Sequence, residues 1–169
     1  MRSLFYVEMA KDFGNGVRLA REAGFDCVEV HAGHGYLISQ FLSPYTNRRR
    51  DQYGGPLKNR MKFMQMCMSE VMEAAKGDMA IVAKTNMRDG FKGGNDIEEG
   101  IEIAKELKNL GVHGLVLSGG FVSKAPAAVV EEEKEKQKAD RVDSFLERKN
   151  HTHQRRNCDK DDGEQIFQL

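Results

Sequence analysis

Two histidines and a tyrosine that lie close together in the chain have side chains well suited to chemistry. His31, His34 and Tyr36 belong to the segment HAGHGY, in which the histidines are three residues apart. Imidazole and phenol groups donate hydrogen bonds and transfer protons near neutral pH. A metal site would need a third protein ligand, and none follows nearby. Taken alone, the segment fits a functional site or a polar loop, and Tyr36 also fits a packed aromatic residue.

Polar residues and glycines also follow two later apolar runs, in the segments KTN at 84–86 and SGG at 118–120. In parallel α/β folds the carboxyl ends of the strands form the ligand-binding edge. We therefore expect the histidines and Tyr36 to share one crevice with Lys84, Asn86 and Ser118. Lys84 by itself also fits a solvated charge, and the pattern alone names no reaction.

Helices and strands alternate in an order that would position these side chains. Helical spacing and terminal glycines predict three helices, and short apolar runs between them predict three strands. The helices are expected over 9–23, 59–75 and 96–110, and the strands over 25–31, 79–86 and 112–118. This alternation is typical of βα units around a parallel sheet. The strands are apolar at almost every position, which predicts that both of their faces are covered.

The segment 32–58, between the first strand and the second helix, is long enough for a functional loop. Its three arginines at 48–50 are expected to pair with Asp51 and cap loop structure, rather than to bind nucleic acid. Asn59 is expected to cap the helix that follows. The methionines of that helix recur at helical spacing, which predicts adaptable core packing.

Length and charge narrow the classes of function. The chain has 169 residues, whereas a complete (β/α)8 barrel typically needs ~250. The net charge is zero, which gives no electrostatic case for nucleic acid or an anionic membrane. No apolar run approaches the ~20 residues that span a bilayer, and no signal peptide is evident. The scattered cysteines Cys27, Cys67 and Cys158 predict a reduced, cytoplasmic protein.

The composition changes near residue 130, which divides the chain into a globular part (1–130) and a charged tail (131–169). The tail has too few apolar residues to offset the entropy of ordering it. Opposite charges three or four residues apart favour an exposed helix over Glu131–Lys149. We expect a solvated helix followed by disorder, without chemistry of its own.

A longer pattern resembles a known family. The block GFDCVEVHAGHGYLISQFLSPYTNRRRDQYGGPLKNRMKF is similar to the central signature of the old yellow enzyme family of FMN-dependent ene-reductases and NAD(P)H:flavin oxidoreductases. The later block IVAKTNMRDGFKGGNDIEEGIEIAKELKNLGVHGLVLSGGF continues the match, so that the resemblance covers residues 10–126. It implies a partial TIM barrel of about three consecutive βα units, followed by the charged tail.

The resemblance also implies roles for four residues. His31 and His34 match the pair that binds the oxygen of an electron-poor alkene, and Tyr36 matches the residue that protonates the neighbouring carbon. Lys84 matches a basic residue, often arginine, at the electron-rich edge of the flavin ring. The implied cofactor is FMN, with NADH or NADPH as the hydride donor. No metal is implied.

Some features depart from the family pattern. Gly33 stands where many relatives have alanine, Pro56 replaces a common serine, and lysine at 84 lacks the planar fork of arginine. The first barrel strands and the two later strands that hold the FMN phosphate have no counterpart here. A frameshift or a gene truncation would account for the abrupt change after Pro126. The resemblance therefore leaves three alternatives open: an active enzyme, an inactive fragment that needs a second copy or a complementing chain, and an interaction module that works through the 131–149 helix.

Overall fold

The computed structural model describes residues 2–121 and 166–168. The helix expected over Glu131–Lys149 and the boundary at residue 130 lie outside the described residues. The described elements are the helices α1 (Arg2–Glu22), α2 (Leu37–Leu42), α3 (Leu57–Arg60), α4 (Lys62–Ala75) and α5 (Ile97–Asn109), and the strands β1 (Cys27–His31), β2 (Ala80–Asn86), β3 (Gly114–Ser118) and β4 (Ile166–Gln168).

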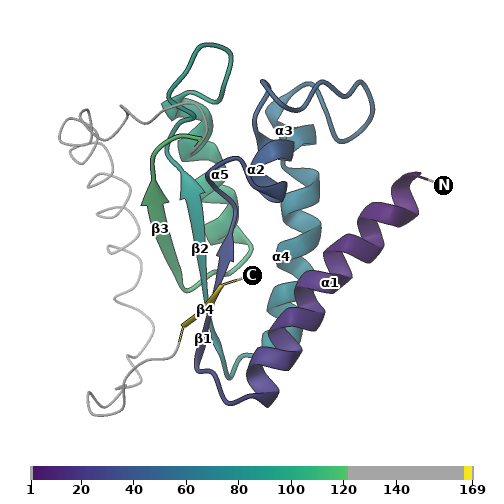
Figure 1. The fold of residues 1–169 in the computed structure, drawn as a ribbon, viewed down its shortest axis with the longest axis vertical. Coiled ribbons are helices and arrows are strands. Elements are labelled where there is room, and N and C mark those ends of the chain that lie inside the picture. The colour runs from purple at the N-terminus through teal and green to yellow at the C-terminus, as the bar shows by residue number, and fades with distance from the viewer. Residues whose placement is uncertain (1, 122–165, 169) are drawn as a thin grey trace.

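The strands form one parallel sheet in the order β3-β2-β1-β4 (Figure 1). The alternation of β1, α4, β2, α5 and β3 confirms the predicted βα units. Strand β4 was not predicted, because residues 131–169 were expected to hold only a solvated helix and disorder. It pairs with the edge of β1 that β2 leaves open, with Cys27 opposite Ile166 and Val28 opposite Phe167. The sheet edge beside β1 is therefore partly covered.

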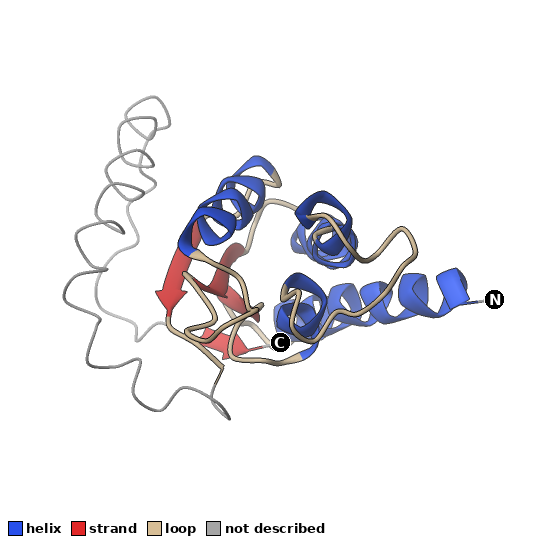
Figure 2. Cartoon of the chain, turned by 90° about the horizontal axis from the view of Figure 1, so that it is seen from above, coloured by secondary structure: helices blue, strands red, loops and turns tan. Residues whose placement is uncertain are grey.

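The helices are gathered on one side of the sheet, and the apolar core lies between these two layers (Figure 2). Val28 and Val30 of β1 and Ile81 and Ala83 of β2 are fully buried. Each fully buried side chain of valine or isoleucine size contributes about 1.5–3 kcal/mol to folding. The helical side of the core includes Val17, Phe63, Met64, Met68, Val71, Ile103 and Leu107. Met64 and Met68 of α4 are thus core residues, as predicted, and Met61, Met66 and Met72 pack partly buried against this core.

The other face of the sheet is only half-buried, and here the prediction that both faces are covered was wrong for the described residues. His31, Lys84 and Val116 lie side by side in one row of the pairing register across β1, β2 and β3. Val116 exposes 36% of its surface. Because side chains alternate between the faces of a strand, this open face also carries Glu29 and Val82. His31, Lys84, Asn86 and Ser118 therefore belong to the open face.

The helix boundaries differ from the predicted ones by more than one residue at two places. Helix α1 begins seven residues before the predicted start at Met9, and its added turns are held through Tyr6, whose ring packs edge-on against Phe41, Tyr53 and Phe63. Helix α3 begins after Pro56, so the prediction that Asn59 caps a helix was wrong. Asn59 instead lies inside α3 and donates to the carbonyl of Gly54 at 3.2 Å. Among the described helices, none combines the length and the apolar character needed to cross a membrane.

Candidate functional site

The carboxyl ends of β1, β2 and β3 bring together the polar side chains that the sequence placed in one crevice. His31 ends β1 and lies opposite Lys84 of β2, while Asn86 at the end of β2 lies opposite Ser118 at the end of β3. The loop after β1 then carries His34 across to the end of β3, where its ring meets Ser118 and its backbone forms an isolated parallel bridge with Phe121, three residues beyond the strand. The predicted grouping of His31, His34, Lys84, Asn86 and Ser118 is therefore present.

The ring of His31 is oriented by its own loop. The backbone N–H of Gly33 donates a hydrogen bond to Nδ1 of His31 at 3.1 Å. A ring nitrogen that accepts a hydrogen bond carries no proton, so the neutral imidazole holds its proton on Nε2. His31 therefore presents Nε2–H as the group that a ligand would meet.

His34 is fixed by three separate constraints. Its backbone N–H donates to Oδ1 of Asn86 at 3.0 Å, and its ring Nε2 lies 2.6 Å from Oγ of Ser118. Its φ of +59° is in the left-handed region, which is uncommon for a residue with a side chain. The next residue, Gly35, has φ +85°, and a Cβ there would lie 2.4 Å from the ring of Phe121. This turn therefore requires glycine at position 35.

Tyr36 lies beside the two histidines. Its ring centroid is 5.0 Å from that of His31, and the centroids of His31 and His34 are 4.8 Å apart, all in edge-on arrangements. Tyr36 is 57% exposed, so it does not serve as a core residue here. The three side chains thus form one cluster at the end of β1, in which Tyr36 is exposed and the two histidines are half-buried.

Lys84 forms an ion pair with Glu29, with Nζ 2.8 Å from Oε1. The two side chains are 20% and 10% exposed, and they belong to adjacent strands. The alternative of a solvated charge is therefore wrong for the lysine. Sequence reasoning missed Glu29, although a single acid within the apolar run of β1, two residues before His31, was a usable signal.

The two charges of this pair shift the pKa of each histidine in opposite directions: Lys84 lowers it and Glu29 raises it. Burial lowers the pKa of His31, and the neighbouring His34 and Lys84 lower it further, while Glu29 raises it. The pKa of His34 is also lowered, first by burial and then by Lys84, again against an opposing effect of Glu29. Both imidazoles are therefore biased towards the neutral form, which keeps one N–H donor and one acceptor on each ring.

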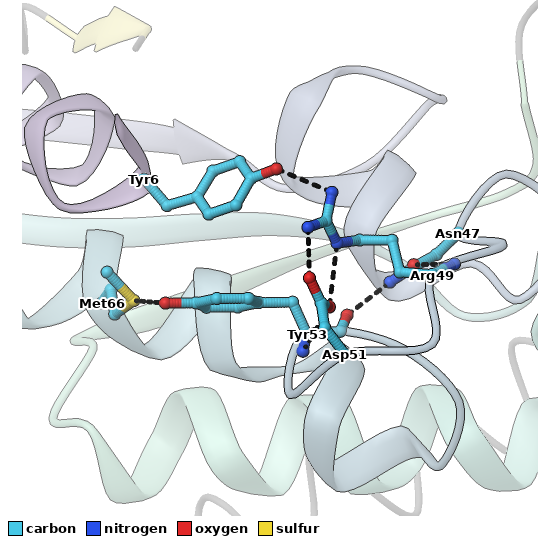
Figure 3. A network of polar contacts seen from close by, with 6 residues as sticks. All are labelled: Tyr6, Asn47, Arg49, Asp51, Tyr53 and Met66. Carbon is cyan, nitrogen blue, oxygen red and sulfur yellow. Dashed lines mark hydrogen bonds and ion pairs between the residues drawn. The ribbon is translucent and has the colours of Figure 1, made fainter. Parts of the chain in front are cut away.

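The loop between α2 and α3 is anchored to α1 by a polar network (Figure 3). Arg49 donates to the hydroxyl of Tyr6 at 2.7 Å and makes a two-pronged ion pair with Asp51. Asn47 donates to the carbonyls of Phe41 and Tyr53, both at 2.7 Å. The expected pairing of the arginine run with Asp51 is confirmed for Arg49.

A second network runs through the buried side chain of Arg60 to the site. Arg60, which is 3% exposed, binds the carboxylate of Glu99 and donates to Oδ1 of Asn95 at 2.7 Å. The buried Asp89 accepts from the backbone N–H of Asn95 at 2.8 Å and from the amide of Asn86 at 3.2 Å. Asn86 in turn accepts from His34, so a chain of hydrogen bonds links the protein interior to the histidine loop.

The donor set suits an uncharged or anionic oxygen better than a metal ion. Within residues 2–121 and 166–168, no three histidine, cysteine or acidic side chains come together as a metal site would require. Two neutral imidazoles side by side offer N–H groups, which stabilise negative charge that develops on an oxygen. A phenol nearby supplies an acid.

A family model described as "NADH:flavin oxidoreductase / NADH oxidase family" matches residues 7–160. Among curated relatives, an NADPH dehydrogenase of Listeria monocytogenes is 45% identical over 120 residues, which are 70% of this chain and 35% of that protein. An NADH oxidase of Thermoanaerobacter brockii is 41% identical over 119 residues, or 70% of this chain and 18% of that protein. The chain thus spans about a third or less of the length of these relatives.

Solved structures agree with the partial barrel. A morphinone reductase in complex with tetrahydroNAD is 32% identical with a TM-score of 0.59, over 66% of this chain and 31% of that one. An old yellow enzyme homologue from Zymomonas mobilis is 30% identical with a TM-score of 0.60, over 66% and 32%. A 2-naphthoyl-CoA reductase is 34% identical with a TM-score of 0.66, over 69% and 18%. The described βα units correspond to part of the TIM barrel of the old yellow enzymes.

Proposed function

This chain belongs to the NADH:flavin oxidoreductase / NADH oxidase family, and we propose that it carries the substrate-side half of a flavin site that reduces electron-poor C=C bonds. One observation carries the proposal: the rings of His31, His34 and Tyr36 lie together at the carboxyl end of β1, beside Lys84 of β2. The chain spans only 35% of the length of the Listeria NADPH dehydrogenase. The activity of the whole protein is therefore proposed together with this site.

The two histidines would bind the carbonyl or nitro oxygen of the substrate. His31 offers Nε2–H, because its Nδ1 is occupied by the N–H of Gly33. When hydride adds to the far carbon of the double bond, negative charge moves to this oxygen. Donors that are already oriented stabilise that charge without reorganisation, and such a donor is worth roughly 2.7–4 kcal/mol in comparable sites.

Tyr36 would act as the general acid. It is exposed and lies against His31, so its phenol can reach a substrate whose oxygen the histidines hold. The proton would go to the carbon next to the carbonyl, which completes the addition of hydride and proton across the double bond. General acids of this kind typically contribute 10²–10⁴-fold to the rate.

The open face of the sheet would receive a planar cofactor with an electron-rich edge. Lys84 supplies a cation on this face, and Val116, in the same row, exposes 36% of its surface to an apolar partner. When bound there, FMN would take hydride from NADH or NADPH and pass it to the substrate. Lys84 would contact the electron-rich edge of the flavin ring, and the ion pair with Glu29 would keep Lys84 in position.

A second candidate is a chain that binds no flavin by itself. The exposed surface of Val116 favours it, because the half-buried face of a barrel strand needs further strands to cover it. A second copy or a complementing chain would then supply the missing cover.

A cytoplasmic location also stays a prediction, which cell fractionation would test.

Steady-state kinetics with 2-cyclohexenone, FMN and NADPH would test the proposal on the full chain. We expect His31→Ala and His34→Ala to lower kcat/KM at least tenfold, because they remove donors to the developing charge, and Tyr36→Phe to lower kcat more than it raises KM. Lys105→Gln, which removes an exposed pair far from the histidine cluster, serves as the control and should match the wild type. Unchanged kinetics in the histidine variants would contradict the assignment.

A further inference from the structure

The contact between His34 and Ser118 joins the loop after β1 to the end of β3. Nε2 of His34 and Oγ of Ser118 are 2.6 Å apart, although the two residues are separated by 84 positions in the sequence. Through this contact a side chain of β3 engages the histidine pair directly. It therefore determines which ring nitrogen of His34 remains for a ligand.

Both partners are held in place by their backbones. Ser118 pairs with Asn86 in the register of β2 and β3, and its carbonyl accepts from the N–H of Met87 at 2.8 Å. His34 is fixed by its backbone hydrogen bond to Asn86 and by the tight turn at Gly35. The backbone positions at both ends of this contact are therefore held, and from them the two side chains meet at 2.6 Å.

A neutral imidazole has one N–H, and the neighbour of each nitrogen decides where the proton lies. Within the described residues, Nδ1 of His34 has no hydrogen-bond partner, which makes it the nitrogen open to a ligand. If the serine hydroxyl donates to Nε2, then Nδ1 carries the proton and becomes a donor. If Nε2–H donates to the serine, then Nδ1 offers only a lone pair, which would repel a substrate oxygen.

We propose that Ser118 is a positioning residue whose hydroxyl donates to Nε2 of His34 and so keeps the proton of the neutral ring on Nδ1. This inference rests on the proposed function, because a substrate oxygen needs an N–H donor such as Nδ1–H. It also predicts a property that can be measured without a ligand: the neutral rings of His31 and His34 hold their protons on opposite nitrogens. Gly33 selects Nε2–H in His31, and Ser118 selects Nδ1–H in His34.

Long-range ¹H–¹⁵N correlation spectra of the imidazole rings test the proposal on the full chain without flavin or substrate. At a pH where both rings are neutral, His34 should show a protonated Nδ1 and an unprotonated Nε2, and His31 should show the reverse. Ser118→Ala should remove the preference for Nδ1–H in His34 and leave His31 unchanged. Ser118→Thr, which keeps the hydroxyl, should restore it.

A protonated Nε2 in His34 of the wild type would overturn the proposal, because the serine would then be the acceptor. The proposal would also be overturned if Ser118→Ala left the proton of His34 on Nδ1, because the serine would then not determine its position. The wild-type spectrum decides the question even if a variant fails to fold. A chain that binds no flavin but shows opposite protonation in the two histidines would contradict the proposed function alone.

Discussion

Glu29 and Lys84 are joined by an ion pair across β1 and β2, with 2.8 Å between Oε1 and Nζ, on the face of the sheet that carries the histidines. The pair is mostly withdrawn from water, since its side chains are 10% and 20% exposed. Its two charges also act in opposite directions on the pKa values of His31 and His34. The pair is therefore both a structural contact and part of the electrostatics of the site.

Replacing Glu29 by glutamine should destabilise the fold. The lysine charge would remain in a mostly buried position without its partner. Breaking a fully buried pair costs ~3–5 kcal/mol, and we expect about 2 kcal/mol here because a fifth of the lysine side chain reaches water. Urea denaturation measures the change in the free energy of unfolding. Glu102→Gln, in an exposed pair, is the matched control and should leave this free energy nearly unchanged. Equal effects of the two substitutions would contradict the account.

The stability of the chain should fall as the pH drops below about 6.5. The pKa values of His31 and His34 are lowered in the folded state from an ordinary value of 6.5. The unfolded state therefore binds protons first as the pH falls, which favours unfolding. Urea denaturation at several pH values between about 5 and 8 should show a rising free energy of unfolding up to 6.5. A double variant with glutamine at both positions should flatten this slope, and a slope that stays the same would refute the assignment.

Gly35→Ala should destabilise the histidine turn more than its backbone conformation alone explains. A left-handed φ costs a residue with a Cβ about 1–2 kcal/mol, and at Gly35 the added carbon also meets the ring of Phe121. Gly24 has nearly the same φ, +86°, but has nothing within 4 Å of an added Cβ. Gly24→Ala is therefore a control for the conformational cost. Thermal or urea denaturation should show a larger loss for Gly35→Ala, and equal losses would show that the contact with Phe121 is unimportant.

Tyr6→Phe should loosen the loop between α2 and α3. The substitution removes the hydroxyl that accepts from Arg49, and we expect a loss of about 1 kcal/mol. Hydrogen exchange should become faster in residues 43–56. Tyr53→Phe is a suitable control in the same network, because its hydroxyl makes only a 3.7 Å contact with the sulfur of Met66 (Figure 3). Slower or unchanged exchange in Tyr6→Phe would count against the anchoring role.

The sequence predicted the three βα units because their signals are local. The residues of each apolar run and the glycine after each helix lie within a few positions of one another. The carboxyl ends of the strands then follow from the parallel topology, which is why His31, Lys84, Asn86 and Ser118 could be placed together.

Features that depend on distant partners were not predictable in the same way. Strand β4 is three residues long, and only its pairing with β1 makes it a strand. The first turns of α1 depend on the packing of Tyr6 against Phe41 and Tyr53. The ion pair of Glu29 could be recognised only from the register of β1 against β2, because its partner Lys84 lies 55 positions later in the sequence. The roles of the site residues remain predictions.

The central claim is that this chain builds the substrate side of a flavin site, and a visible absorbance scan tests it most directly. The purified full chain would be mixed with FMN, freed of excess cofactor and compared with Lys84→Met and with the exposed control Lys105→Met. We predict a yellow protein whose flavin band is shifted from that of free FMN, with less bound flavin in Lys84→Met than in the control. A colourless wild-type protein would contradict the claim and favour the candidate that binds no flavin by itself.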